Sequence, residues 1–481
     1  MRKRQLVVVG AGPAGMSAAI TAADAGVNVV VIDENPRVGG QIYRQLPSSL
    51  QVAKANQSGS DFRRGDDLHK RFQSLKHRIE LQTDTTAWGL FSSNRLAVVR
   101  GDAWEMLEAE TVVLASGAYE YVPPFPGWTL PGVMTPGAAQ LMVKSMHVRP
   151  GQRVLLAGTG PFLLVVACAL DKAGVNVVGI VEAATTHDGL RALPSLLWQP
   201  KLLWQGWRYL RQVRRAGIPH YRGHVVLEAH GDEQVRSVTI APCDSEWFPD
   251  RSQAREVEVD TLCVGYGFVP RTQLAQLAGC RMRFTNEVGG WIPEADEHLL
   301  TSASGIYVAG DGRGVAGAIV AELEGHLAGL AVSHRLGVLD QSGFERQRRP
   351  VFRQLARLGR FRAALDRVSR PRPGLSSLAT DETLVCRCEE LTLAEVKTGV
   401  DAGGTDIRTL KVMTRLGMGA CQGRMCWPAM VRFLAQLTGK TCEEIGPVSV
   451  RPPLKPVTLG TLAQPDRNGS REGTPLAEVT K

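Results

Sequence analysis

The sequence contains no run of 18 consecutive apolar residues, the length that a membrane-spanning helix needs. Aromatic residues make up 6% of the chain, and no zinc-finger, RRM-like or aromatic-interleaved basic motif occurs. Hydrolase motifs are absent too: no H-E-x-x-H stretch, Ser/His/Asp set or paired-carboxylate motif is found. These absences argue against a membrane-spanning, nucleic-acid-binding or hydrolytic protein.

Lysine and cysteine are scarce. Only 12 of the 56 basic residues are lysine, so the net charge of +9 is an excess of arginine. Nine cysteines in 481 residues, four of them between 386 and 426, do not resemble the disulfide framework of a secreted protein. We therefore expect a cytoplasmic protein, with a length that corresponds to about three domains.

The N-terminal segment reads as a strand, a glycine-rich turn, a helix to about Ala25 and a second strand ending at Asp33. Gly10, Gly12 and Gly15 form G-x-G-x-x-G: the first makes the tight turn, the second lets backbone approach a pyrophosphate, and the third lets the helix pack closely on the strand. The phosphates would lie at the helix N-terminus, and the Asp33 carboxylate can accept hydrogen bonds from an adenosine ribose. This pattern predicts a dinucleotide-binding βαβ unit.

The segment after Asp33 favours a flavin dinucleotide. Residues 34–47 carry Gly39 and Gly40, where backbone could pass close to a flavin. Residues 78–117 read as short strands of one antiparallel insertion. The proline-rich run PPFPGWTLPG then indicates a crossing to a new domain.

A second βαβ unit follows, with Gly158 and Gly160 in its turn and Glu182 at the end of its second strand. Leu163 stands where the third glycine is expected and would hold the helix further from the strand. The sequence therefore predicts a nucleotide-binding fold and leaves open whether NAD(P), another adenine nucleotide or no ligand occupies it.

The chain then returns to the first domain through TLCVGYGFVP and SGIYVAGDGRG. The strand IYVAG ends at Gly310 and Asp311, over the expected cofactor crevice, where the Asp311 carboxylate could hold a ribityl hydroxyl. A helix from about Gly317 could point its N-terminus at the flavin.

In this order, VVVGAGPAG, VVVIDE, ASGA, VGYGFVP and YVAGD resemble the two-dinucleotide-binding-domain flavoprotein oxidoreductases over residues 1 to about 335. The disulfide-reductase members of that group carry a redox cysteine pair near the flavin, which this sequence lacks, so disulfide reduction is disfavoured. The resemblance implies FAD contacts at Gly10, Gly12, Ala14, Gly15, Asp33, Glu34, Gly40, Gln41, Gly117, Gly310 and Asp311.

Four cysteines form the most specific motif. Cys386 and Cys388 form C-x-C, and Cys421 and Cys426 form C-x4-C within GMGACQGRMCWP. Two close thiolate pairs suit zinc or an iron-sulfur cluster, but C-x-C is tight for two ligands of one structural zinc. The spacing therefore favours a [2Fe-2S] cluster, with zinc and an unligated cysteine group as alternatives. The remaining cysteines are expected to be packing residues: Cys168, Cys243, Cys263, Cys280 and Cys442.

Residues 384–439 resemble the bacterioferritin-associated-ferredoxin type of [2Fe-2S] domain, whose common form has C-x2-C as its second pair. With the FAD module and the tail RPPLKPVTLG, nearly the whole chain resembles the FAD-binding subunit of opine oxidases, hydrogen cyanide synthase and related proline or hydroxyproline dehydrogenases. This resemblance implies a heteromeric complex that oxidises an amino acid or opine. Its other expected members are an amine-oxidase-like flavoprotein and a small ferredoxin-like protein, each a separate subunit.

Two segments are rich in basic and apolar residues. Residues 340–378 carry ten arginines, and apolar residues from Phe352 to Leu365 recur at spacings of three and four, which predicts a basic amphipathic helix. One buried and one solvated face is the simplest interpretation, and an acidic partner or anionic surface is the alternative. In an earlier basic stretch, core positions are expected for Trp198, Trp204, Trp207 and Leu210.

The predicted fold class is α/β: two Rossmann-like dinucleotide-binding domains plus a small, mainly helical [2Fe-2S] domain. The predicted function is electron relay from FAD to the cluster in a heteromeric dehydrogenase; a self-sufficient NAD(P)H-dependent flavin reductase and a zinc-holding scaffold are alternatives. No catalytic acid or base is assigned. The expected segments are an FAD-binding domain (1–120 and 266–335), an NAD(P)-binding-like domain (121–265), a basic helical linker (336–380), the cluster domain (381–445) and a tail (446–481).

Overall fold

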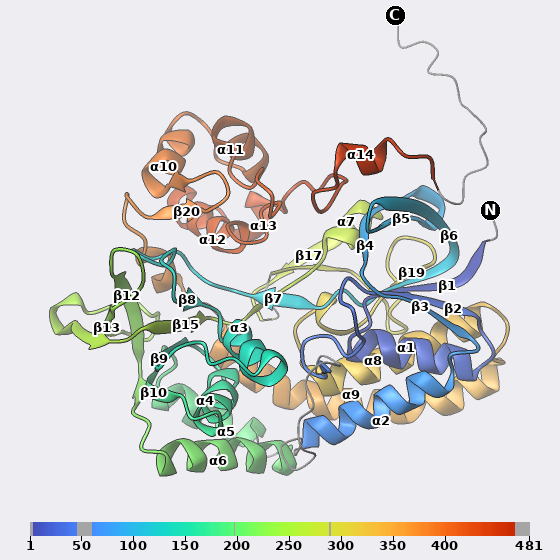
Figure 1. Cartoon of the computed structure of the whole chain (residues 1–481), viewed down its shortest axis with the longest axis horizontal. Helices are drawn as coiled ribbons and strands as arrows, with labels where there is room; N and C mark the ends of the chain where they lie inside the picture. The colour runs from blue at the N-terminus through green and yellow to red at the C-terminus, as the bar shows by residue number, and fades with distance from the viewer. Residues whose placement is uncertain (1–2, 46–59, 197, 288–289, 467–481) are drawn as a thin grey trace, which may run out of the picture.

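The computed structural model describes residues 3–45, 60–196, 198–287 and 290–466. Two sheets built around parallel strands lie side by side, and a helical C-terminal region packs above the second one (Figure 1). Residues 467–481 of the expected tail lie outside the described residues.

The first sheet has the strand order β3-β2-β1-β6-β5-β4, with β19 beside β6. β1 pairs in parallel with β2 and β6, and β6 pairs in parallel with β19, so the carboxyl ends of these strands share one edge. Ligands of open α/β sheets bind at this edge. The parallel strands are β1 (Arg4–Val9), β2 (Val29–Ile32), β3 (Ile79–Gln82), β6 (Ala103–Leu114) and β19 (Ile306–Val308).

The insertion differs from the prediction in its first strand. β3 pairs in parallel with β2 and extends the main sheet, whereas β4 (Thr85–Phe91), β5 (Arg95–Arg100) and β6 pair antiparallel. The prediction of one antiparallel insertion over 78–117 is therefore wrong for β3. The physical reason is helix α2 (Ser60–Ser74), which supplies the crossover that a parallel pair requires.

Helices α1 (Pro13–Asp24) and α8 (Ala318–Arg335) pack on each other beneath the first sheet (Figure 1). Their backbones approach closely because a Cβ atom at Gly325 would lie 2.1 Å from the Ala14 carbonyl oxygen. α8 begins at Ala318, directly after Gly317, as the sequence predicts. Its N-terminus points toward the edge where β1 and β19 end.

The second sheet has the order β11-β10-β9-β15-β8, all parallel. Its strands are β8 (Val133–Met134), β9 (Arg153–Gly158), β10 (Asn176–Glu182), β11 (His220–Arg222) and β15 (Thr261–Gly265). The helices near it are α3 (Pro136–Leu141), α4 (Phe162–Lys172), α5 (Thr186–Leu196) and α6 (Pro200–Arg215). A three-stranded antiparallel sheet adjoins it: β12 (His224–His230), β13 (Ser237–Pro242) and β14 (Arg255–Glu258).

Two crossing strands connect the sheets. β7 (Ala118–Glu120) leaves the first sheet, β16 (Phe268–Pro270) returns from the second, and the two pair antiparallel. After β16 come α7 (Gln273–Leu277) and the hairpin of β17 (Met282–Thr285) and β18 (Gly290–Pro293).

The cysteine-containing region is helical, as predicted. It comprises β20 (Leu384–Cys386), β21 (Leu391–Thr392), α10 (Leu393–Asp401), α11 (Ile407–Thr414), α12 (Trp427–Thr438) and α13 (Cys442–Ile445). Its buried residues form one continuous core with those of β12 and β13, and the Trp128 indole donates a hydrogen bond to the Leu384 carbonyl at 2.6 Å. The region therefore packs on the second domain.

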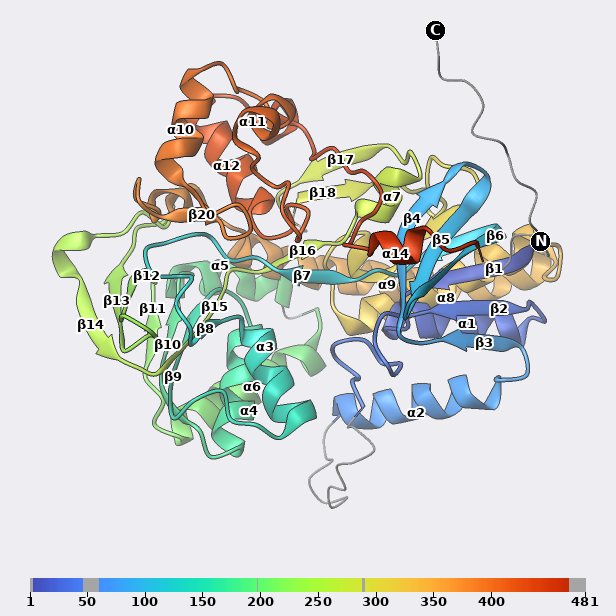
Figure 2. The same ribbon diagram turned by 45° about the horizontal axis from the view of Figure 1, so that its top comes forward.

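The tail runs back to the first domain. The amide of Leu454 donates to the Trp88 carbonyl at 2.9 Å, and α14 (Leu459–Leu462) lies against β6, beside β4 and β5 in Figure 2. The Trp104 indole donates to the Gln464 carbonyl at 2.8 Å. The tail thus connects the cysteine-containing region to the first domain.

The two basic segments form helices with different outcomes. α9 (Gln341–Ser369) is the amphipathic helix that the pattern predicts, and it packs against α8 and α5. In α6 the expectation of core tryptophans is wrong: Trp204 and Trp207 are 59% and 42% exposed, Trp198 in the preceding turn is 61% exposed, and Val213 is the buried residue of the helix. α6 lies at the edge of the second domain, and no other helix or strand of the described residues lies over its outer face (Figure 1). Among the described residues, no helix is long and apolar enough to cross a membrane.

Candidate functional site

One large cavity connects the elements that the sequence singles out. Its volume is about 840 Å³. It starts at the turn between β1 and α1, passes the crossing strands β7 and β16 and the second glycine turn, and reaches the loop after Cys421. Of the predicted FAD contacts, its walls include Gly10, Gly12, Ala14, Asp33, Glu34, Gly40, Gln41, Gly117 and Asp311.

Backbone atoms wall the first part of the cavity because side chains do not fit there. Gly10 has φ +103°, and a Cβ atom on it would lie 2.4 Å from the Ala115 carbonyl oxygen. Gly40 has φ +61°, and a Cβ atom on it would lie 2.8 Å from Gly12 Cα. The N-terminus of α1 opens onto this glycine-lined channel, with no acidic residue in its first turn. These features fit the pyrophosphate of a dinucleotide.

Two predicted contacts have packing roles and do not line the cavity. A Cβ atom at Gly15 would lie 1.7 Å from the Gly10 carbonyl oxygen, so Gly15 sets the close approach of α1 to β1. A Cβ atom at Gly310 would lie 2.8 Å from the Cβ atom of Ala14. Both glycines allow close packing of the elements that carry the cavity wall.

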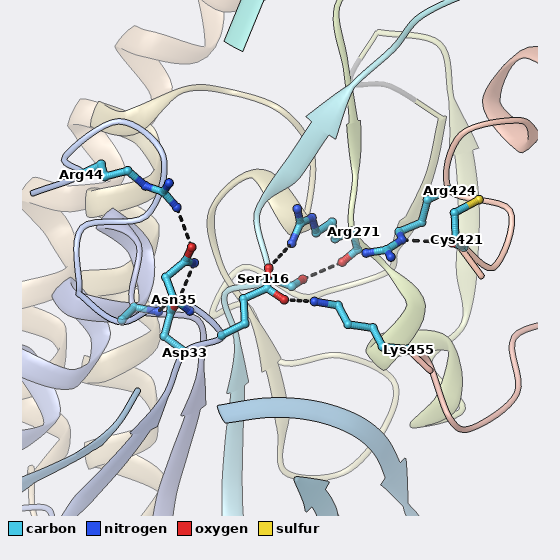
Figure 3. Close-up of polar contacts among 10 residues, drawn as sticks. Asp33, Asn35, Arg44, Ser116, Arg271, Cys421, Arg424 and Lys455 are labelled. Carbon is cyan, nitrogen blue, oxygen red and sulfur yellow. Dashed lines mark hydrogen bonds and ion pairs between the residues drawn. The ribbon is translucent and has the colours of Figure 1, made fainter. Parts of the chain in front are cut away.

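Asp33 is buried at the end of β2, and its carboxylate is held from two sides. One oxygen accepts the Ala11 amide at 2.6 Å, and the other accepts the Asn35 amide at 2.7 Å and the Asn35 side chain at 2.8 Å (Figure 3). The side chain is thus fixed before any ligand arrives, at the position where a ribose is expected.

Glu34 is paired with two cations that sequence reasoning missed. Arg271 Nη1 lies 3.0 Å from its carboxylate, and Lys455 forms a second ion pair with it. Burial lowers the pKa of both Arg271 and Lys455. The Asp33 carboxylate also interacts with the charges of both cations, so two cations and two carboxylates face one another on this part of the cavity wall. Lys455 comes from the tail, 421 residues from Glu34, so no local pattern could have revealed it.

Asp311 closes the N-terminus of α8. One of its carboxylate oxygens accepts the amides of Ala316 and Gly317, at 2.9 and 3.0 Å. Behind this turn the Glu324 carboxylate accepts the Gly310 amide and pairs with Arg313, both at 2.8 Å, and burial raises the pKa of Glu324. Asp311 is therefore a rigid part of the cavity wall.

The second glycine turn opens onto the same cavity. Gly158 has φ +141°, and a Cβ atom on it would lie 1.8 Å from the Gly265 carbonyl oxygen. The hydroxyls of Thr159 and Ser369 are buried there without a hydrogen-bond partner among the described residues. Glu182, the carboxylate expected to meet a ribose, instead lies 2.8 Å from His220 Nε2. The end of α9 supplies Ser369 and so covers part of this turn.

The four motif cysteines come together as two contacting pairs. Cys386 on β20 contacts Cys426, the residue before α12, and Cys388 contacts Cys421. The Cys426 thiol and the backbone amides of residues 388, 389 and 417 donate to Cys386 and lower its pKa to about 5. Cys386 and Cys426 are buried, whereas Cys388 is exposed.

The two cysteine pairs are the side chains of this region that could hold a metal centre. In the described part of the chain, no group of three or more His, Cys, Asp or Glu side chains surrounds a single point where one ion could be held. A [2Fe-2S] cluster needs two thiolates at each iron, which two separate pairs can supply. Glycine is needed in this loop, because a Cβ atom at Gly419 would lie 2.2 Å from the Cβ atom of Cys388.

Tyr119 and Arg424 lie between the two parts of the site. Tyr119 on β7 is partly buried, and the loss of solvation raises its pKa. It is close enough to Arg271, Arg424, Cys421 and Cys426 to interact with their charges. Arg424 lines the cavity and belongs to the cysteine loop (Figure 3). Neither residue carries a sequence signal, because only the fold brings β7 beside that loop.

A flavoprotein oxidoreductase with two dinucleotide-binding domains is the class that this fold and cavity define. The family model described as pyridine nucleotide-disulphide oxidoreductase matches residues 4–325. A second model, described as the sarcosine oxidase A3 domain, matches residues 380–465.

The similarity to particular proteins extends over nearly the whole chain. Hydrogen cyanide synthase subunit HcnB of Pseudomonas protegens is 35% identical over 97% of this chain and 98% of that protein. An opine oxidase subunit of Rhizobium meliloti is 35% identical over 95% of this chain and 87% of that protein. The crystal structure of L-proline dehydrogenase from P. horikoshii matches with a TM-score of 0.68 at 25% identity, over 96% of this chain and 80% of that one. The chain belongs to the family that includes hydrogen cyanide synthase subunit HcnB and its opine oxidase counterpart, and it is a flavin-dependent oxidoreductase.

Proposed function

We propose that this chain is the FAD- and [2Fe-2S]-containing subunit of a heteromeric dehydrogenase that oxidises a C–N bond of an amino acid or opine. The single observation that carries the proposal is the continuous cavity, whose walls include both the glycine turn at Gly10 and Gly12 and the cysteine loop at Gly423 and Arg424. A cofactor at the first position would lie in the same enclosed space as the cysteine loop.

The electron count requires this kind of connection. Oxidation of an amine R₂CH–NHR′ to the imine R₂C=NR′ releases two electrons and two protons, and water then hydrolyses the imine to a carbonyl compound and an amine. FAD takes up two electrons together, whereas a [2Fe-2S] cluster carries one electron at a time to a one-electron acceptor. The protein residues hold the flavin dinucleotide through the α1 N-terminus, Asp33 and the cations Arg271 and Lys455.

The cysteine pairs support the second redox group. Backbone amides directed at Cys386 stabilise its thiolate, the form that binds iron. Cys388 is exposed, so an electron acceptor could approach the proposed cluster from the side of this residue. We therefore assign the cluster ligands as Cys386, Cys388, Cys421 and Cys426.

Partner subunits follow from the relatives, several of which are named as subunits of oxidase or synthase complexes. We propose an amine-oxidase-like flavoprotein as the subunit that removes electrons from the amino acid or opine, and a small ferredoxin-like protein as a further partner. This chain would then receive electrons rather than bind the substrate directly.

Anaerobic titration of the purified chain with dithionite tests the proposal. One FAD and one [2Fe-2S] cluster take up three electrons per chain, two at the flavin and one at the cluster. An uptake of two electrons, with no signal from a reduced cluster in electron paramagnetic resonance, would contradict it.

A second candidate function is an NAD(P)H-dependent flavin reductase. It is favoured by the unpartnered hydroxyls of Thr159 and Ser369 at the second glycine turn, which opens onto the same cavity. The contact between Glu182 and His220 counts against it, because that carboxylate is the expected ribose ligand. Bleaching of the flavin by NADH or NADPH under anaerobic conditions would support the reductase.

A further inference from the structure

The positive charge of the chain is concentrated in two helices. α6 carries Lys201 and four arginines and no acidic residue, and α9 carries eight arginines against Glu345 and Asp366. The combined charge of these two helices exceeds the net charge of the whole chain, which is +9, so the remainder of the chain is nearly neutral. The charge is therefore a local property of one region and not of the whole surface.

The exposed face of α6 combines these cations with indole rings. Trp204 and Trp207 stack on each other with ring centroids 4.7 Å apart, and the Arg211 guanidinium lies 5.2 Å from the Trp207 ring. Apart from Pro200 at its start, the exposed residues of the helix are Lys201, Trp204, Trp207, Arg208, Arg211, Arg214 and Arg215. Indole rings on an open helix face lose favourable apolar burial, which some further surface would restore.

The face continues from α6 onto α9. The Arg360 guanidinium of α9 lies 5.0 Å from the ring of Trp198, the exposed residue just before α6. Arg357 and Arg360 are both exposed on the same part of α9. We name Trp198, the exposed residues of α6, Arg357 and Arg360 the Trp-Arg face.

We propose that the Trp-Arg face docks this protein on an anionic lipid surface. Tryptophan rings are favoured at the headgroup level of a bilayer, and Lys and Arg side chains pair with lipid phosphates. All charged side chains of α6 are positive, because the helix has no acidic residue. A folded partner protein would therefore find no alternating charges on α6 with which to fix its orientation. A fluid layer of phosphates needs no such orientation, whereas a protein interface combines donors, acceptors and a shaped apolar centre.

The test is co-sedimentation of the full-length protein with vesicles at 0.1 M salt. Vesicles of phosphatidylcholine and phosphatidylglycerol in equal parts are compared with pure phosphatidylcholine. The proposal predicts binding to the first and not to the second, with a blue shift of tryptophan fluorescence on binding and release at 0.5 M salt.

Two variants locate the binding surface. Arg208→Gln/Arg211→Gln is expected to weaken binding about 25-fold, since each basic residue near an anionic surface strengthens attachment about fivefold. Trp204→Ala/Trp207→Ala is expected to weaken binding and abolish most of the blue shift. The control variants change exposed residues elsewhere: Arg95→Gln/Arg408→Gln removes two arginines, and Leu459→Ser removes an exposed apolar side chain. Both should bind like the unmodified protein.

Three results would overturn the proposal. The first is no sedimentation with the anionic vesicles. The second is equal loss of binding in the control variants. The third is loss of a partner subunit, rather than of vesicle binding, when the Trp-Arg face is changed, which would assign the face to an acidic protein. If a variant fails to fold by circular dichroism, Lys201→Gln/Arg215→Gln removes two other exposed cations and takes its place.

Discussion

The Nε atom of Arg424 donates a hydrogen bond to the carbonyl oxygen of Cys421 at 3.1 Å, while the Arg424 side chain lines the large cavity (Figure 3). The cation therefore stands between the cysteine loop and the space assigned to the flavin. Positive charge at this place stabilises an added electron on either side of it.

Arg424→Gln should lower the reduction potential of the proposed cluster. Removal of the cation makes the reduced state less favourable, and we expect a shift of roughly 40–80 mV for an interaction of about 1–2 kcal/mol. A redox titration followed by electron paramagnetic resonance measures the shift. Arg408→Gln on α11 is the matched control and should leave the potential unchanged. An unaltered potential in Arg424→Gln would show that the side chain only shapes the loop.

The four motif cysteines should differ from the other five in their effect on iron content. Cys388→Ser and Cys421→Ser each remove one thiolate of a pair and are expected to lose most of the bound iron, with FAD retained. Cys442→Ser, in the same region but outside the two pairs, should keep its iron. Iron and flavin assays on purified variants decide the matter. Full iron in Cys388→Ser would remove this residue from the ligand set.

Two glycine-to-alanine variants should have opposite effects on stability. At Gly15 the new Cβ atom would lie 1.7 Å from a carbonyl oxygen, so we expect destabilisation of roughly 3 kcal/mol and loss of FAD. At Gly359, inside α9, no atom lies within 4 Å of the new Cβ atom, and alanine should stabilise the helix by up to about 1 kcal/mol. Thermal unfolding midpoints measure both. Equal midpoints would refute the packing account of α1 and β1.

Stability should depend on pH through Asp366 on α9. Burial raises the pKa of this carboxyl from 3.8 to about 6, although Arg362 lies beside it at 2.7 Å. A raised pKa in the folded state means that the contribution of Asp366 to stability is complete below pH 4 and is lost as the pH rises through about 6.

The corresponding variant is Asp366→Asn, which keeps the shape of the side chain and does not titrate. Between pH 4 and 6 the free energy of unfolding of the unmodified protein should fall relative to this variant by about 2 kcal/mol, with a slope of at most about 1.4 kcal/mol per pH unit. Denaturant unfolding over this pH range provides the comparison. Parallel pH profiles of the two proteins would contradict the assignment.

The parts of the site that are local in sequence could be predicted, and those that depend on long-range contacts could not. The turn at Gly10 and Gly12, the carboxylate at Asp33 and the start of α8 after Gly317 follow from βαβ geometry. Lys455 reaches Glu34 only because the tail crosses back over the first domain. The sequence within a few residues of Lys455 does not indicate where the tail runs.

Burial was the least predictable property. The apolar spacing of Trp204 and Trp207 resembles that of a core helix, but the stripe they belong to faces outward, since Val213 occupies the inner face of α6. Which face is covered depends on the neighbouring layer, and that layer ends at α6. The prediction for β3 was wrong because the helix α2, which precedes it, was not predicted from the sequence. Without that helix, a parallel pairing of β3 with β2 could not be expected.

The central claim is that one chain holds both a flavin and a two-iron cluster. The most direct test is the visible absorption spectrum of anaerobically purified protein, with released FAD, iron and zinc quantified on the same sample. The account predicts one FAD and two irons per chain, no stoichiometric zinc, and broad absorbance beyond the flavin bands. FAD with zinc or with no metal, after iron-sulfur reconstitution has been attempted, would contradict it.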